Sequence, residues 1–178
     1  SEHNRNSVDM MLAVNGIPVV AIELKNQLTG QTVDNAKLQW QYDRDQREPA
    51  FWLNHRILAY FAVDLYEAWM ATELKGANTY FLPFNQGSNG AGNDGGAGNP
   101  QTKDGDYITS YIWENVLQKD SLLDIIQKFI SFEVKSEKKN GKNVTKKRLI
   151  FPRFHQLDVV RKLIADVREN GSGNNYLI

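Results

Sequence analysis

The chain has 178 residues, of which 41% are hydrophobic and 24% are charged, and Lys plus Arg equals Asp plus Glu at 21 each. This composition fits one folded domain and excludes disordered and fibrous chains, while the balanced charge does not by itself indicate a nucleic-acid-binding protein. The lack of cysteine excludes disulfides, thiolate zinc sites and cysteine nucleophiles, and no apolar run approaches the length of a membrane span or signal peptide. We therefore expect a soluble cytoplasmic protein.

The first predicted element is a β-hairpin that carries acidic residues on both strands. Residues 8–14 and 17–25 flank an Asn-Gly turn, with Asp9 on the first strand and Glu23 and Lys25 on the second. Two carboxylates can bind a divalent cation, and Lys25 projects to the same face as Glu23 because side chains alternate along a strand. Phosphodiester hydrolysis requires such a cluster to hold a metal, position water and offset charge on phosphorus.

The same spacing of common residue types also arises by chance, so its setting matters. An apolar run from Val19 to Ile22 leads directly into Glu23, and a buried charge needs a reason. Asp9 can lie opposite Glu23 only if the numbers of paired residues sum to 32, whereas a plain two-residue turn gives 31. We therefore predict a three-residue turn or a bulge near Pro18, which lacks a ladder N–H.

Beyond the hairpin, helical and strand patterns alternate, which predicts an α/β fold. A glycine-rich stretch in the middle lacks the Gly-Lys-Ser/Thr of a phosphate-binding loop, so we expect a surface loop there. One helix is expected to begin at Ser121, with Asp124 as its capping partner. In chain order we predict a helix from Thr32 or Asp34 toward Asp45, strands at 56–64 and 65–73, the loop at 85–106, helices at 106–118 and 121–132, a hairpin at 132–150 and a helix at 154–170.

The predicted hairpin at 132–150 is strongly basic. It holds seven Lys and Arg against two Glu, a local net charge of +5. Such a surface can contact a phosphate backbone, and we take Lys138, Lys139 and Lys142 as candidate DNA-binding residues. The alternative is that these lysines only keep an exposed hairpin soluble and protect its edges.

Together with Gln39 on the following helix, Asp9, Glu23 and Lys25 resemble the core of the PD-(D/E)XK nucleases. The chain as a whole resembles the amino-terminal endonuclease region of the restriction (R) subunit of type I restriction enzymes. The strings that carry this second resemblance are Asp43-Arg44-Asp45 with Glu48-Pro49, Phe81-Leu82-Pro83-Phe84-Asn85, Gly96-Ala97-Gly98-Asn99-Pro100, Ser110-Tyr111-Ile112-Trp113 with Asp120-Ser121-Leu122-Leu123, and Phe151-Pro152-Arg153-Phe154-His155-Gln156.

The resemblance implies a role for each candidate residue. Asp9 and Glu23 would ligate Mg²⁺, and Lys25 would steady the attacking hydroxide or the scissile phosphate. Gln39 matches the first position of a Gln-x-x-x-Tyr motif, from which its amide would orient Lys25 or contact DNA. The tyrosine of that motif has no exact counterpart, because Tyr42 comes one residue early.

Near the C-terminus, Phe154-His155-Gln156 resembles the glutamine motif with which superfamily 2 helicases and translocases read adenine. Gln156 would therefore contact ATP, but only in the intact subunit, because no Gly-Lys-Ser/Thr is present in this chain. The alternative is a polar residue at a helix start.

The resemblance also implies an architecture and partners. We expect a restriction-endonuclease-like mixed sheet flanked by helices, with residues 1–132 as the nuclease domain, 133–150 as a basic hairpin or linker, and 151–178 as the start of a helicase-like motor domain. A helix that often precedes the first catalytic strand would be missing, since only eight residues precede Asp9. The expected partners are double-stranded DNA and the methyltransferase (M) and specificity (S) subunits, with no membrane. The alternatives are a repair or recombination nuclease and a non-catalytic docking module for the methyltransferase core.

Overall fold

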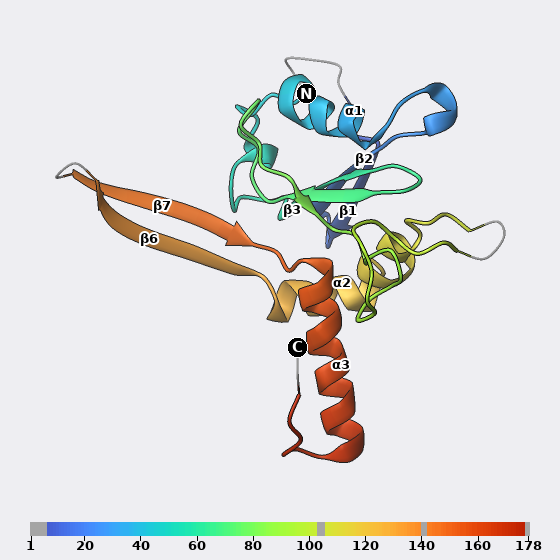
Figure 1. The fold of residues 1–178 in the computed structure, drawn as a ribbon. Coiled ribbons are helices and arrows are strands. Elements are labelled where there is room, and N and C mark those ends of the chain that lie inside the picture. Colours follow the sequence, from blue (N-terminus) through green and yellow to red (C-terminus); the bar gives the residue numbers. More distant parts are fainter. Residues whose placement is uncertain (1–6, 103–105, 140–141, 177–178) are drawn as a thin grey trace.

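The computed structural model describes residues 7–102, 106–139 and 142–176 and is built around a five-stranded sheet (Figure 1). Its strands, β1 (Met10–Val14), β2 (Ile17–Leu24), β3 (Ala59–Val63), β4 (Ala68–Ala71) and β5 (Leu82–Pro83), are hydrogen-bonded in that order. Only the β2–β3 pair is parallel, and the other neighbours are antiparallel. The predicted mixed sheet flanked by helices is therefore confirmed, although β3 and β4 are shorter than the strands expected from sequence.

The β1–β2 hairpin contains the predicted irregularity. Next to the turn, Val14 pairs with Ile17 and the residue numbers sum to 31, whereas Met10 pairs with Ile22 and the numbers sum to 32. Val19 is the extra residue, and it adjoins Pro18. A bulge of this kind moves the strand by one position and so reverses which side chains face each side of the sheet beyond it.

The chain crosses from β2 to β3 over one face of the sheet. This crossover holds the 3₁₀ turns η1 (Gln27–Thr29) and η3 (Pro49–Phe51), the helix α1 (Val33–Leu38) and a π-helical turn η2 (Gln39–Asp43). The helix begins after Thr32 as predicted, but regular α-helix ends at Leu38 instead of continuing toward Asp45. Trp40 on the π turn is buried and donates its indole N–H to the carbonyl of Phe61 at 2.9 Å, which anchors the crossover to β3.

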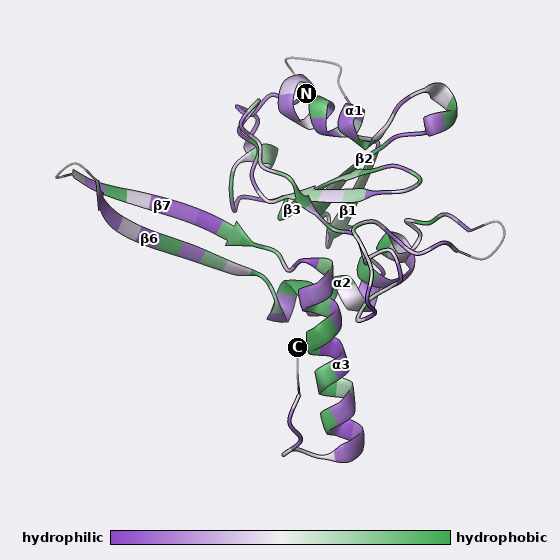
Figure 2. Cartoon of the chain, in the orientation of Figure 1, coloured by the Kyte–Doolittle hydropathy of each residue, from purple (hydrophilic) through white to green (hydrophobic). Residues whose placement is uncertain are grey.

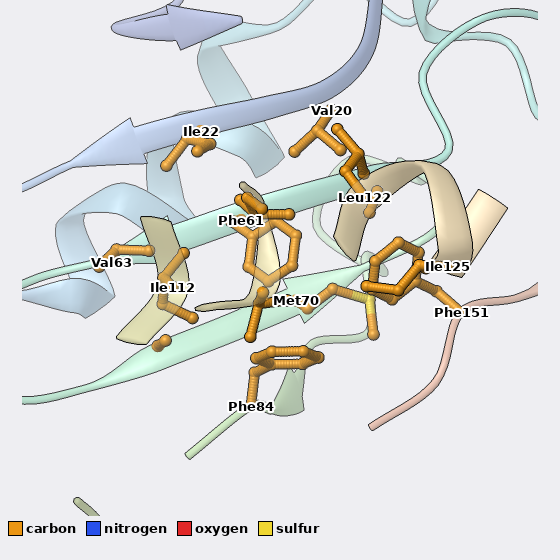
Figure 3. Close-up of a cluster of buried hydrophobic side chains, with 14 of the residues drawn as sticks. Val20, Ile22, Phe61, Val63, Met70, Phe84, Ile112, Leu122, Ile125 and Phe151 are labelled. Carbon is orange, nitrogen blue, oxygen red and sulfur yellow. The ribbon is translucent and has the colours of Figure 1, made fainter. Parts of the chain in front are cut away.

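The opposite face of the sheet is covered by the π-helical turn η4 (Ile112–Val116), the helix α2 (Lys119–Lys128) and the first turn of α3 (Phe154–Asn170). Alternate residues of β2 and β3 point to this side, because side chains of a strand alternate between faces. Phe61 and Phe84 meet edge-on near its centre, with ring centroids 5.2 Å apart. Figure 3 shows the resulting core, formed among others by Val20, Ile22, Phe61, Val63, Met70, Phe84, Ile112, Leu122, Ile125 and Phe151.

Two of the predicted helices differ from those observed. In place of a helix at 106–118, the structure has the short turn η4, and α2 begins before Ser121. The predicted capping pair was wrong, because the Ser121 hydroxyl donates to the carbonyl of Val116 at 2.8 Å and Gln118 caps the helix. Asp124 instead forms an ion pair with Lys128 one turn later. A buried hydrogen bond to the preceding turn thus outweighed the local capping pattern.

The predicted basic hairpin is confirmed as β6 (Ser131–Lys139) and β7 (Lys142–Ile150), a separate two-stranded sheet that projects from the body in Figure 1. Figure 2 shows hydrophilic stretches along both of its strands, whereas β2 and β3 are largely hydrophobic. The Thr72 hydroxyl donates to the carbonyl of Leu149 at 2.9 Å and fixes the base of the hairpin to β4.

Residues 151–176 contribute the single helix α3, which extends away from the sheet (Figure 1). One helix does not make a motor domain, so the division at residue 151 stays a prediction. None of the helices in the described part of the chain is both long and apolar enough to cross a membrane.

Candidate active site

The bulge brings the two predicted carboxylates together. Continued by one pair beyond Met10, the register that sums to 32 places Asp9 opposite Glu23, and directly opposed residues share a face of the sheet. The Asp9 carboxylate also accepts the backbone N–H of Leu24 at 2.9 Å and so takes the place of a ladder partner at the start of β1. Asp9 is exposed whereas Glu23 is completely buried, so this pair spans the boundary between solvent and core.

Glu23 has a buried counter-charge. One Nη atom of Arg44, directly after the π turn, contacts a Glu23 carboxylate oxygen and donates to the carbonyl of Ser7 at 2.9 Å. Among the described residues, the second Glu23 oxygen, Oε2, has no hydrogen-bond partner. Burial raises the pKa of Glu23 to about 7, with Arg44 opposing the rise and the neighbouring Asp9 carboxyl adding to it. One oxygen of the carboxylate is therefore held by Arg44, and the other is buried without a hydrogen-bond partner among the described residues.

Lys25 and Gln39 line one polar pocket of about 380 Å³ next to this pair. Lys25 follows β2, and its backbone N–H donates to the carbonyl of Val63 at 2.9 Å, which extends the parallel pairing by one residue. The side-chain amide oxygen of Gln39, Oε1, is buried and has no hydrogen-bond partner among the described residues. Tyr42 and Asp43 from the π turn complete one wall of the pocket. The crossover thus carries an amide and a phenol toward the lysine.

The residues here fit a magnesium ion. No group of three or more His, Asp or Glu side chains that could hold a metal occurs in the described residues. Magnesium keeps several waters and is commonly bound by one or two carboxylates together with substrate phosphate, so a large protein cage is not required. Asp9 and the unpartnered oxygen of Glu23 supply that pair, and the donors are hard oxygens.

A family model described as the type I restriction enzyme R protein N terminus matches residues 1–80. This part of the chain is similar to that family. No curated protein and no solved structure gives a significant match. The matched part of the chain contains both carboxylates, Lys25 and Gln39, and it ends before the basic hairpin and α3.

The other predicted site residues lie away from this cluster. Gln156 is exposed in the first turn of α3, where its side-chain oxygen accepts the backbone N–H of Arg153 at 2.9 Å and caps the helix. Lys138 is exposed on β6, opposite Asn143 on β7. The side chains of Lys139 and Lys142 lie outside the described residues. The DNA contacts of the three lysines and the adenine contact of Gln156 stay predictions.

Arg44 is the residue of this site that the sequence patterns did not assign. It was noted only within the string Asp43-Arg44-Asp45, with no role attached. A signal for it existed, because a glutamate at the end of an apolar buried strand requires a counter-charge. An arginine at the end of the crossover that packs on that strand is the natural candidate.

Proposed function

We propose that this chain is the N terminus of a type I restriction enzyme R protein and acts as a Mg²⁺-dependent nuclease that hydrolyses phosphodiester bonds of double-stranded DNA. The observation that carries the proposal is the bulge at Val19, which sets Asp9 opposite Glu23. Lys25 follows on the same face, and all three lie in the segment that matches the family. Bulges are common next to active sites, where they re-aim a side chain.

Each side chain has a defined part in the proposed reaction. Asp9 and Glu23 would hold Mg²⁺, and a bound metal would supply the Lewis acidity that polarises a phosphate and activates water. The ammonium of Lys25 offsets negative charge that develops on the scissile phosphate. The amide of Gln39 lines the same pocket and orients Lys25. Arg44 keeps Glu23 oriented, with its free oxygen available to the metal.

The similarity to that family supports a wider setting for the chain. We propose that the chain acts within an R subunit whose helicase-like motor domain begins near residue 151 and uses ATP, with Gln156 at the adenine. The basic hairpin, residues 133–150, would link nuclease to motor and contact DNA through Lys138, Lys139 and Lys142. Partner M and S subunits would supply modification and sequence choice.

A second candidate function is a non-catalytic docking module for the methyltransferase core. The contact between Glu23 and Arg44 favours it, because a carboxylate with a buried counter-charge can be purely structural. The unpartnered Glu23 oxygen favours the nuclease, since a structural carboxylate normally has both oxygens satisfied.

The proposal is tested by Asp9→Asn and Lys25→Ala in the complete R subunit assembled with its M and S partners. We expect DNA cleavage to be lost while ATP hydrolysis stays within about twofold, because the motor lies outside the nuclease. Asp34→Asn is a matched control, since Asp34 is an exposed aspartate at the start of α1 that forms an ion pair with Lys37. Full cleavage by the Asp9 variant would reject the nuclease and favour the docking module.

A further inference from the structure

A second pocket lies beside Lys25, on the side of the sheet opposite α1. Its volume is about 300 Å³, and its walls come from the ends of β2 and β3 and from the segment before η4. Tyr107 and Trp113 stand there edge to face, with ring centroids 6.1 Å apart. Both rings remain partly open to solvent, with 58% and 44% of the residue exposed. We call this site the aromatic pocket.

The aromatic pocket is fixed relative to Lys25 by buried hydrogen bonds. The backbone of Lys25 is bonded to Val63, and the next residue, Asp64, accepts the hydroxyl of Thr109 on its carbonyl at 2.8 Å. Thr109 is buried and lies between the two aromatic residues in sequence. The end of β3 therefore holds both Lys25 and the segment that carries the two rings, so the distance between Lys25 and the rings is fixed.

The charge of the aromatic pocket favours an anionic chain. Lys25 and Asp64 are the charged residues among those lining it. The Asp64 carboxylate is turned inward, where it accepts backbone N–H groups of Val33, Tyr66 and Glu67 and the side-chain amide of Gln27. Lys25 also lines the pocket beside Gln39, so it is the cationic residue that borders both pockets.

We infer that the aromatic pocket stacks one unpaired nucleobase of the DNA strand whose phosphate lies at Lys25. The inference rests on the proposed function, which places the scissile phosphate at that lysine. Aromatic faces bind any base, and single-stranded sites combine such faces with basic residues that follow the backbone. A duplex keeps its bases stacked internally, so this pocket makes the nuclease favour frayed, melted or single-stranded DNA close to the cut.

The test measures binding separately from cleavage. The 178-residue chain is titrated, without divalent metal, with a fluorescent eight-nucleotide oligothymidylate, the same strand with abasic sites, and a duplex of equal length. We expect Trp113→Ala and Tyr107→Ala each to weaken binding of the oligothymidylate roughly 5- to 100-fold, with little effect on the abasic strand or duplex. Trp113→Phe should retain most of the affinity, and Trp52→Ala, which removes another exposed tryptophan, should retain all of it.

Fluorescence gives a second readout that does not depend on the alanine variants. Oligothymidylate should quench the tryptophan emission of the unmodified chain, and Trp113→Phe should remove most of that quenching. Unchanged affinity in Trp113→Ala, or an equal loss on the abasic strand, would overturn the inference. This binding assay involves no cleavage, so its outcome is independent of the outcome of Asp9→Asn. If Asp9→Asn abolishes cleavage while Trp113→Ala binds oligothymidylate normally, the aromatic pocket is rejected and the nuclease proposal stands.

Discussion

The buried carboxyl of Glu23 predicts an unusual dependence of stability on pH. Its pKa is about 7 in the folded chain, against 4.5 for an ordinary glutamate, and the difference corresponds to about 3 kcal/mol. Because the folded state has the higher pKa, it binds the proton more tightly than the unfolded state. The stabilisation is complete below about pH 4.5 and is lost as the pH rises through 7.

Glu23→Gln provides the measurement, because glutamine has the size of the protonated side chain and cannot ionise. Urea unfolding of both proteins from pH 4 to pH 8 should give free energies that differ little at pH 4. By pH 8 the variant should have gained about 3 kcal/mol relative to the unmodified chain. Curves that stay parallel across this range would show that Glu23 does not change protonation there, and the reasoning from burial would be wrong.

Arg44→Met is the matched control for this prediction. It removes the interaction that opposes the rise in the pKa of Glu23 and leaves an ionised carboxylate without its buried partner. We expect a loss of about 3–5 kcal/mol at pH 8 and a much smaller loss at pH 5, where Glu23 is protonated. An equal loss at both values would point to packing instead of charge.

Three further predictions address the remaining residues. In the complete R subunit, Gln39→Ala should lower the cleavage rate at saturating DNA with little change in DNA affinity, measured by single-turnover kinetics, and a pure affinity loss would place Gln39 on the DNA. Neutralising Lys138, Lys139 and Lys142 should weaken DNA binding and flatten the slope of log affinity against log salt by about 0.9 per lost phosphate contact, whereas an unchanged slope would remove the hairpin from the DNA path. Thr109→Val should cost about 1–3 kcal/mol in urea unfolding, because its buried hydroxyl bond is lost, and no cost would mean that this bond does not hold the aromatic segment.

The β1–β2 register was predictable because it follows from arithmetic on two residues and a turn. If Asp9 faces Glu23, an extra residue must exist, and Pro18 marked where the ladder could break. The contact between Arg44 and Glu23 was not predictable in the same way. This contact depends on where the crossover places Arg44 relative to β2. That position is set by a π turn, which has no clear sequence signal.

The aromatic pocket was equally hidden from the sequence. In the sequence, Trp113 belongs only to a string that resembles the family and lies within the helix predicted at 106–118. The structure instead shortens that helix, and the buried bond from Thr109 to Asp64 decides where the rings stand. Long-range hydrogen bonds of this kind outweigh local helix propensity, which is a weak preference per residue.

The π turn from Gln39 to Asp43 makes the site depend on chain length. In an α-helix, residues five apart point about 140° away from each other, whereas a π turn bonds i to i+5 and brings them toward one side. Gln39 and Arg44 are separated by that interval, and Gln39 lines the polar pocket beside Lys25 whereas Arg44 contacts Glu23. Removing one residue here would restore a regular helix and turn Arg44 away. Homologues should therefore conserve the number of residues in this turn as well as Gln39 and Trp40.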